Sequence, residues 1–574
     1  MLAISSPMVY YLYMASIVRK KQNGKTYYCL VESARVSGKP RIVSQRYLGP
    51  AEEIMARLST GSGEPTATRH HQFGDVAAVW SMLKRLNVAG IIDEVVGSRR
   101  TDAAASVGTY IALATLNRIV APCSKLAFAE WWGKTSGERL VRLSDAALDH
   151  RRFWDAMNAI SAVDLATIEH AITMKMAETF GIDISALVLD MTNFATYIDS
   201  ANYRAPIAQR GHAKQKRDDL RLVGLGLIVT RDFGIPLVSH AYAGDRPDVT
   251  QFPHLVSKFL ACFSALGGGE DDLTVVFDAG QDSADNLSLV TGSSLHFVGS
   301  IPPGQHPELL GVAPGRFEVV DEDRFPGVTA FQASVDAFGS TFRAVVTHSD
   351  NFHEKQARGF TQTLSKATRQ LDQIAARLAG GKTRKSRASV ETEIAGVLKA
   401  RWVSRVVTWE LTGDKPANFS LAFSVDKAAR LALEAEVFGK RILFTDRDDW
   451  SVAEIVAAYR SQFEVEADFR QMKDRKVVSF SPMFHWTDQK IRVHAFYCVL
   501  ALTIARLMAR EASQANCPMS VRRLLATLGD IQETVLLYKG DRGRPRARHV
   551  LTEMDPTQKK LYDLFGLATY APKR

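Results

Sequence analysis

The alternation of apolar and polar positions divides the first third of the chain into two blocks of different element type. Residues 14–50 contain short strand-like runs separated by turn signals at Asn23-Gly24 and Gly38-Lys39-Pro40. Apolar residues then recur at helical spacing almost without a break from VAAVWSMLKRL to AITMKMAETFG. The pattern therefore predicts a basic β-rich segment over 1–50, with a first strand from Met8, a linker over 50–75 and a helical domain over 76–180.

From residue 186 the pattern changes to short apolar runs of strand type. They are ALVLDMTNF, LRLVGLGLIVT, IPLVSHAYA, LTVVFDAG and LHFVGSIPP, with one helical run between the third and the fourth. Residues 310–450 add the strand-like runs FRAVVTHS, WVSRVVTWEL, FSLAFSVD and RILFTD around a helical segment. These runs predict a mixed α/β sheet. The strongly apolar helical run over 488–511 is typical of a core helix.

Charge narrows the range of partners. The 574-residue chain has a net charge of +10, which favours an anionic partner such as nucleic acid. Residues 354–387 hold nine Lys/Arg and two Asp/Glu (9 − 2 = +7), and apolar residues at helical spacing indicate a helix. The size of the charge imbalance favours a DNA-facing helix over a merely solvated one. The first 18 residues lack the basic start of a signal peptide, and the five cysteines form no C-x-x-C pair. We therefore expect a protein of a reducing compartment that has no membrane partner.

The stretch YRSQFEVEADFRQMKD is predicted to be one helix with two distinct faces. Its apolar stripe is Val465, Phe469 and Met472, and its polar line is Tyr459, Gln462, Glu466 and Lys473. Glu466 and Lys473 lie roughly 10 Å apart along the helix axis, so they are poorly placed to pair with each other. Each of them needs another partner.

Two further acids stand at the ends of apolar runs. Asp190 closes ALVLD and Asp278 closes LTVVFD, where each aspartate could instead cap a following turn. Strand-end side chains gather at one edge of a sheet, and with Glu466 from the helix they would offer three carboxylates to divalent ions. Such ions can drive phosphoryl transfer. GGKTRKS around Lys382 lacks the first glycine of a phosphate loop, so we predict no nucleotide-hydrolysing site.

Taken together, these motifs resemble those of DDE transposases of bacterial insertion sequences. One branch of that family has a Y-x2-R-x3-E-x6-K signature, which Tyr459, Glu466 and Lys473 match in spacing, while Gln462 takes the arginine position. LVLDMTNF resembles the family's D-x-T-x-F stretch. The segments Arg210–Asp248, FDAGQDSADN and His485–Phe496 follow in the family's order.

The resemblance implies a ribonuclease-H-like α/β core over 181–300 and 451–510. A mostly β insertion domain with a basic helix over 301–450 would interrupt this core. The helical domain and the β ribbon before it would bind terminal inverted repeats, and residues 511–574 would serve dimerisation or DNA contact.

The resemblance also assigns roles to single residues. Asp190, Asp278 and Glu466 would be the catalytic, metal-binding triad for Mg²⁺, with Mn²⁺ as a substitute and no need for ATP. Lys473 would contact a DNA phosphate, and Tyr459 would stack on a base or contact the backbone. Gln462 would lie at the DNA without the charge of the usual arginine, and Arg460 and Arg470 are the candidates to replace that charge.

The implied function is a DNA transposase that cleaves insertion-sequence ends and joins them to target DNA, as a homodimer in the bacterial cytoplasm. The cut could proceed by direct transfer or through a hairpin, and the sequence does not choose between them. Two alternatives stay open: a non-catalytic DNA-binding protein derived from a transposase, and a metal-dependent DNA nuclease on the same fold.

Overall fold

The computed structural model describes most of the chain, and its contacts divide the chain into two compact units. The described residues are 14–22, 24–36, 39–59, 64–97, 105–199, 201–211, 219–265, 273–382, 384–539 and 546–573. The start of the strand expected from Met8 lies outside them, as do residues 212–218 of the Arg210–Asp248 segment. Unit 1 comprises Met1–His71, Glu533–Thr552 and Pro572–Arg574, and unit 2 comprises Gln72–Gln532 and Glu553–Ala571.

Unit 1 contains two small antiparallel sheets. The first has the order β1-β2-β3, from Met14–Gln22, Lys25–Val36 and Lys39–Gly49, as the alternating pattern predicts. Gly24 has a φ of +73° in the first turn, a conformation that favours glycine. The linker predicted over 50–75 is wrong in part, because it contains helix α1 (Ala51–Ser59) and strand β4 (Ala67–Gln72). β4 completes a second sheet, β17-β16-β4, with β16 (Gln532–Tyr538) and β17 (Arg546–Leu551).

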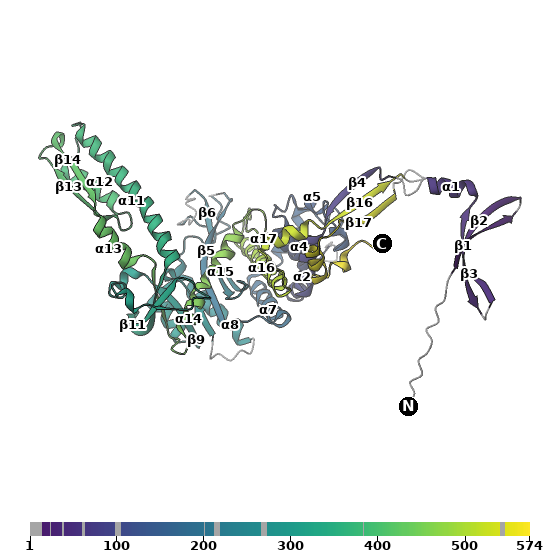
Figure 1. The fold of residues 1–574 in the computed structure, drawn as a ribbon, viewed down its shortest axis with the longest axis horizontal. Coiled ribbons are helices and arrows are strands. Elements are labelled where there is room, and N and C mark those ends of the chain that lie inside the picture. Colours follow the sequence, from purple (N-terminus) through teal and green to yellow (C-terminus); the bar gives the residue numbers. More distant parts are fainter. Residues whose placement is uncertain are drawn as a thin grey trace, which may run out of the picture. The chain divides into compact units, whose positions relative to one another are not determined.

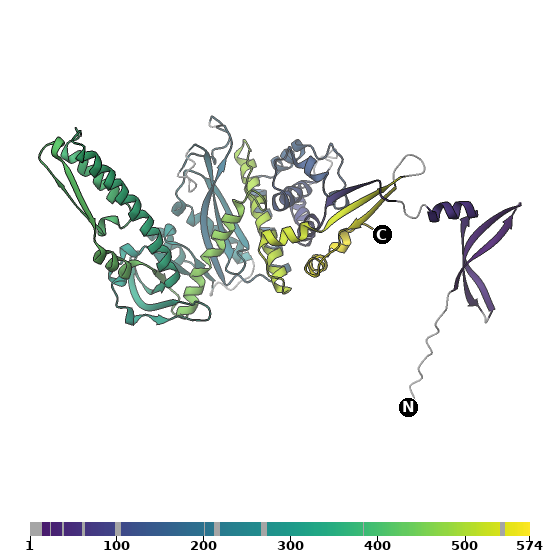
Figure 2. The ribbon, with the colours of Figure 1, turned by 45° about the horizontal axis from the view of Figure 1, so that its top comes forward.

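The helices predicted over 76–180 are present, and they belong to unit 2 together with the large sheet. They are α2 (Gly74–Arg85), α3 (Val88–Val96), α4 (Val107–Val120), α5 (Phe128–Trp132), α6 (His150–Asn158) and α7 (Ala162–Phe180). Helix α16 (Asp488–Gln514) packs against α2, α4, α6 and α7 and also against the sheet (Figures 1 and 2). Position 180 thus marks a change of element type within one compact unit.

Helix α16 is the predicted core helix. By length and composition it is apolar enough to cross a membrane, but 89% of its most apolar window is buried inside the protein. Such burial is typical of a core helix in a globular domain. The helices α17 (Val521–Gly529) and α18 (Pro556–Leu564) follow it in unit 2.

A nine-stranded mixed sheet forms the centre of unit 2, in the order β10-β11-β12-β15-β9-β8-β5-β6-β7. The predicted runs give β5 (Ala186–Thr196), β6 (Arg221–Thr230), β7 (Pro236–Ala243), β8 (Leu273–Val276) and β9 (Leu295–Ile301). β5, β6 and β7 pair antiparallel, whereas β5, β8 and β9 pair parallel. Helix α8 (Phe252–Ala265) connects β7 to β8, and α9 (Ala284–Thr291) connects β8 to β9.

The region expected to be an insertion contributes strands to this same sheet. β15 (Lys440–Thr445) pairs antiparallel with β9, and β12 (Ser340–Ser349) pairs with β15. β11 (Val328–Ala337) and β10 (Glu318–Val319) complete that edge, after the short helix α10 (Pro307–Leu310). Part of the 301–450 region therefore extends the sheet and is not a domain separate from it.

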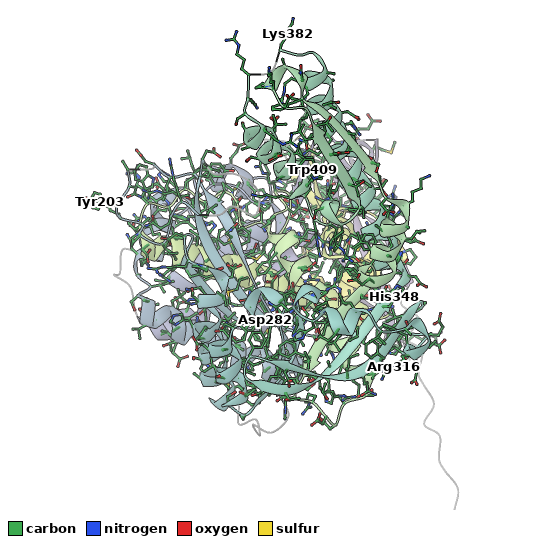
Figure 3. The ribbon with its side chains drawn as sticks, turned by 90° about the vertical axis from the view of Figure 1, so that its left-hand side faces the viewer. Tyr203, Asp282, Arg316, His348, Lys382 and Trp409 are labelled. Carbon is green, nitrogen blue, oxygen red and sulfur yellow. The ribbon has the colours of Figure 1, made fainter. Side chains whose placement is uncertain are left out.

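The rest of that region projects from the sheet as a helical and β segment. It consists of α11 (Asp350–Ala379), α12 (Arg387–Leu398), the hairpin β13 (Val407–Thr412) and β14 (Ser420–Val425), and α13 (Lys427–Val437). Lys382 and Trp409 mark the two parts of this projection in Figure 3. The apolar face predicted for α11 is buried, from Leu364 to Leu378.

Some of the basic side chains of this segment are paired with acids of α12. Arg377 donates to both carboxylate oxygens of Glu393, at 2.9 and 2.7 Å, and Lys385 donates to one of them at 2.8 Å. Arg387 donates to Glu391 at 2.9 Å. Because both glutamates lie just beyond residue 387, the +7 excess overstates the positive charge that α11 presents.

Candidate active site

Pairing in the sheet brings Asp190 and Asp278 side by side. β5 and β8 pair in parallel, with Ala186 opposite Thr274 and Val188 opposite Val276. Extending this register by two residues on each strand places Asp190 beside Asp278. The two predicted acids thus lie side by side just beyond the end of β8. The prediction that Asp190 ends its own strand is wrong, because pairing with β6 continues β5 to Thr196.

Asp278 is held at this edge by several protein donors. Its Oδ1 accepts hydrogen bonds from the backbone N–H of Ala279 at 2.9 Å, the hydroxyl of Ser300 at 2.8 Å and the hydroxyl of Tyr459 at 3.0 Å. The bond to Ala279 makes Asp278 the N-cap of a short 3₁₀ turn. The capping role considered for this aspartate is therefore real, and it coexists with a place in the site.

The D-x-T-x-F alternation puts Asp190, Thr192 and Phe194 on one face of β5. Lys473 donates from Nζ to the hydroxyl of Thr192 at 2.8 Å, and its Nζ lies 5.6 Å from the centroid of the Phe194 ring. Lys473 therefore has these contacts on β5, the strand that carries Asp190. Its predicted contact with a DNA phosphate would have to be made in addition to these bonds.

The stretch predicted as one helix is two helices. α14 (Val452–Arg460) ends at Ser461, and α15 (Gln462–Met472) begins directly after it. The Ser461 hydroxyl donates to the backbone carbonyl of Ala458, which is a local alternative to the helical ladder. The predicted apolar stripe is buried nonetheless, and α15 packs on β5.

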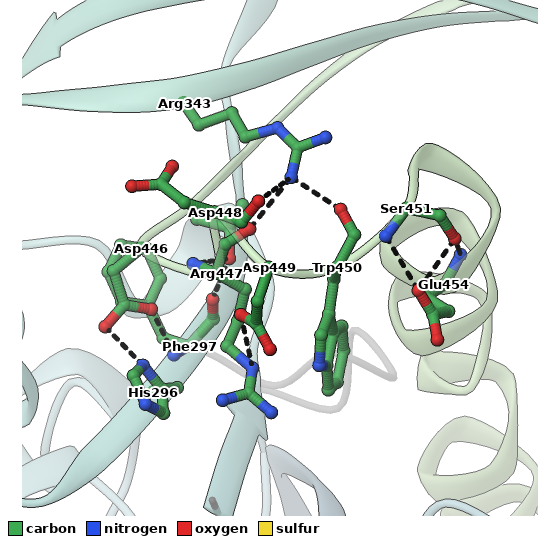
Figure 4. Close-up of polar contacts among 11 residues, drawn as sticks. His296, Phe297, Arg343, Asp446, Arg447, Asp448, Asp449, Trp450, Ser451 and Glu454 are labelled. Atoms are coloured by element: carbon green, nitrogen blue, oxygen red, sulfur yellow. Dashed lines mark hydrogen bonds and ion pairs between the residues drawn. The ribbon is translucent and has the colours of Figure 1, made fainter.

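A network in the loop between β15 and α14 fixes where these helices begin (Figure 4). Arg343 of β12 donates from Nη1 to three backbone carbonyls of this loop, at 2.9, 3.4 and 2.6 Å. Asp446 accepts from the backbone N–H of Phe297 at 2.8 Å. Ser451 and Glu454 then form a capping box at the first turn of α14.

A cavity of about 370 Å³ collects most of the predicted site residues. Its lining comprises Asp190, Asp278, Val328, Thr347, Ser349, Phe352, Gly439, Arg441, Leu443, Val456, Tyr459, Arg460, Gln462, Phe463 and Glu466. All three predicted acids therefore open onto one space. Lys473 and Arg470 do not line it.

The predicted DNA-contact residues differ in how much of their side chains is exposed. Tyr459 lines the cavity but is only 7% exposed and belongs to a core cluster, so little of its surface is open to a base. Burial raises the pKa of its hydroxyl to about 12. Gln462 is also buried, and its Nε2 lies 3.4 Å from the carbonyl oxygen of Leu189. Arg470 is exposed, with its guanidinium 5.8 Å from the centroid of the Phe463 ring.

Among the lining residues that the sequence did not point to, Arg441 is the charged one. Arg441, the second residue of β15, donates from Nη1 to the hydroxyl of Tyr459 at 3.0 Å. Its guanidinium lies over the ring of Phe352 at 4.6 Å. The apolar run RILFTD predicts the strand β15. Its pairing with β9 and β12 then places Arg441 on the wall of the cavity that the acids also line.

Carboxylate oxygens are the kind of ligand that a hard divalent cation such as Mg²⁺ prefers. The three acids are not, however, grouped closely enough to enclose a metal ion by themselves. Within the described residues, no group of three or more His, Cys, Asp or Glu side chains is close enough to hold a metal ion. Mg²⁺, however, is usually bound by one or two carboxylates together with waters and substrate phosphates. Asp190 and Asp278 are the two carboxylates that would serve such a site, with Glu466 elsewhere on the wall of the same cavity.

No protein-family model matches the chain, and no curated protein matches it. Among solved structures it is similar to a piggyBac transposase in a synaptic complex with hairpin DNA, at 9% sequence identity and a TM-score of 0.36, over 81% of this chain and 82% of that chain. Similarity at this level assigns the chain to no family, so its function has to be inferred from the cavity.

Proposed function

We propose that this protein is a DDE-type DNA transposase. It would cleave the terminal inverted repeats of an insertion sequence and join the freed ends to target DNA. The observation that carries the proposal is the single cavity onto which Asp190, Asp278 and Glu466 all open. These three acids come from a strand, from the turn after a second strand and from a helix, and the last of them follows the second by 188 positions (466 − 278).

The topology around the acids supports a ribonuclease-H-like core. Three antiparallel strands, β5 to β7, are followed by two strands that add in parallel on the other side of β5. The first acid lies on the central strand and the second follows the parallel neighbour. In this interpretation the segment from β10 to β15 is an insertion between β9 and the helix that carries Glu466.

Asp190 and Asp278 are the residues that would hold Mg²⁺, or Mn²⁺ in its place, with Glu466 completing the set from the helix side of the cavity. Bound ions of this kind activate an attacking hydroxyl and stabilise the leaving oxygen in phosphoryl transfer. The hydrogen bonds from Ser300, Tyr459 and Ala279 go to Oδ1 of Asp278 and orient that carboxylate. No ATP is required, because one phosphodiester bond is exchanged for another.

The DNA-contact residues and the DNA-binding regions are part of the same proposal. Lys473, held beside β5 by Thr192, would contact a phosphate near the cleaved bond. The basic β ribbon of unit 1 and the helices of residues 76–180 would bind the terminal repeats, and two copies of the chain would join two ends. Arg470 would contact DNA outside the cavity.

The proposal is tested by incubating the purified full-length protein with linear DNA that carries the sequences flanking its gene, together with a supercoiled plasmid. With Mg²⁺ we expect 3′-hydroxyl ends at the repeat boundaries and strand-transfer products in the plasmid, and with EDTA neither. Asp190→Ala should bind the end DNA and leave it uncut. Cleavage without joining would indicate a nuclease, and end binding without any cleavage would indicate a non-catalytic DNA-binding protein.

A further inference from the structure

We propose that Arg441 and Arg460 form a phosphate-binding subsite in the cavity, which takes a backbone phosphodiester of the DNA strand. This inference rests on the proposed function for the identity of the ligand. In this subsite Arg441, from strand β15, and Arg460, from helix α14, provide the positive charge that Gln462 lacks.

The cavity has an acidic part and a basic part. The acids come from β5, from the turn after β8 and from α15, whereas Arg441 comes from β15 and Arg460 is the last residue of α14. Thr347 and Ser349 of β12 add hydroxyl groups to the lining near Arg441, and Thr347 is paired with Arg441 in the sheet register. One space thus offers carboxylates for cations and guanidinium groups for an anion.

Aromatic rings hold both guanidinium groups without neutralising them. Arg441 lies 4.6 Å from the ring centroid of Phe352 and 5.5 Å from that of Tyr459. Arg460 lies 4.8 Å from the ring centroid of Phe325. Stacking of this kind fixes the plane of a guanidinium and leaves its edge N–H groups for a ligand.

The two arginines share the cavity with three acids, so the positive charge is local to the part that Arg441 and Arg460 line. In the part of the chain that the structure describes, neither Arg441 nor Arg460 forms an ion pair with a carboxylate. Burial and the positive charge of Arg441 both lower the pKa of the Arg460 guanidinium. The effect of Arg441 reflects repulsion between the two positive charges. An anion bound between them would relieve this repulsion, and phosphate oxygens match the fork of N–H donors on arginine.

Arg441 also connects the subsite to the acids. It donates to the hydroxyl of Tyr459, which in turn donates to Oδ1 of Asp278. A phosphate held by Arg441 would therefore be placed at a set position relative to Asp278. Arg441 would act as a binding residue for the strand and, through Tyr459, as a positioning residue for that acid.

The salt dependence of DNA binding tests this subsite separately from catalysis. A fluorescein-labelled duplex carrying the flanking repeat is titrated with the full-length wild type, Arg441→Gln and Arg460→Gln between about 50 and 200 mM salt. Each lost phosphate contact should reduce the slope of log affinity against log salt by about 0.9, so affinity should fall about threefold less over that range than it does for the wild type.

Arg324→Gln is the matched control. Arg324 stacks on the same ring of Phe325 at 5.2 Å as Arg460 does, but it does not line the cavity. We expect a wild-type slope for it, and an intermediate cleavage rate for Arg441→Lys, which keeps the charge but loses the fork of N–H donors.

Equal slopes for wild type, Arg441→Gln and Arg460→Gln, with melting temperatures like that of wild type, would overturn the subsite. A changed slope in a protein that never cleaves DNA would support the subsite and contradict the proposed transposase.

Discussion

Tyr459 donates a hydrogen bond of 3.0 Å to Oδ1 of Asp278 and so connects the end of α14 to the turn after β8. The two residues are 181 positions apart, on either side of the segment that extends the sheet. Ser300 donates to the same oxygen. The acid is therefore oriented by groups from two other elements, which is the arrangement expected of a carboxylate that must keep one position during a reaction.

Replacing Tyr459 with Phe should separate its packing from its hydrogen bond. The ring would stay buried, while Asp278 would lose a donor and Arg441 an acceptor. We expect the free energy of unfolding to fall by about 1 kcal/mol. We also expect single-turnover DNA cleavage to fall by roughly tenfold, as one lost orienting contact of about 1.4 kcal/mol would give. Tyr203→Phe changes an exposed ring and should leave both quantities unchanged; an unaltered cleavage rate in Tyr459→Phe would contradict the orienting role.

The bond between Lys473 and Thr192 allows a double-mutant test. If Lys473 contributes only through this bond, Lys473→Met, Thr192→Val and the double variant should be equally defective in cleavage. If Lys473 also contacts a phosphate, as we propose, Lys473→Met should be the more defective single variant and should reduce the salt slope by about 0.9. Equal defects and equal slopes would show that the lysine is structural.

Lys125 predicts how stability depends on pH. Its amine is buried, lies over the rings of Phe153 and Tyr497, and has no hydrogen-bond partner among the described residues. Burial lowers its pKa to about 7, against about 10.4 in an unfolded chain. Between these values the unfolded chain holds a proton that the folded protein lacks, so this residue makes stability rise with pH.

We therefore expect Lys125→Met to melt at a higher temperature than wild type below pH 7. The difference should shrink as the pH is raised towards 10, where both states of the wild-type lysine become neutral. Thermal melting of the two proteins at several pH values measures this. If the difference in melting temperature between Lys125→Met and wild type stays the same at every pH, the lowered pKa of the buried Lys125 amine is contradicted.

Arg343 tests the loop that positions α14. Arg343→Gln removes a guanidinium that donates to three carbonyls, and buried or half-buried hydrogen bonds of a charged donor contribute about 1.5–3 kcal/mol each at most. We expect a lower melting temperature and weaker cleavage, because Tyr459 and Arg460 depend on where α14 begins. Arg358→Gln, on the exposed side of α11, should leave the melting temperature unchanged. A stable Arg343→Gln protein with normal cleavage would show that other contacts fix the loop.

Much of the fold follows from local sequence pattern. The strands β5 to β9 are short apolar runs bounded by polar turns, and α16 is apolar around its whole circumference because it is buried on many sides. Asp190 and Asp278 attract attention as acids that follow apolar runs, and both line the cavity. The pattern does not show that β5 continues past Asp190 to Thr196, because that extension depends on pairing with β6. The buried stripe of Val465, Phe469 and Met472 followed from its spacing.

Other features depend on contacts that a local pattern does not contain. Arg441 reaches the cavity only through pairing between strands far apart in the chain, and Tyr459 is buried because its ring packs under the sheet extension. The break between α14 and α15 lies at Ser461, whose hydroxyl donates to the carbonyl of Ala458, and the helical spacing of the sequence does not indicate this bond. The helix α1 and the strand β4 were hidden in a stretch rich in turn-forming residues, where β16, from the far end of the chain, completes the sheet.

The central claim, that Asp190, Asp278 and Glu466 form one active site, is tested most directly by single-turnover cleavage of end DNA with Mg²⁺ in three isosteric variants. Asp190→Asn, Asp278→Asn and Glu466→Gln should each bind the DNA as wild type does and cleave it at least about 10³-fold more slowly, as expected for groups that act as a unit. Asp285→Asn, an exposed acid on α9 that does not line the cavity, should cleave at the wild-type rate. Cleavage at the wild-type rate by any one of the three variants would contradict the claim.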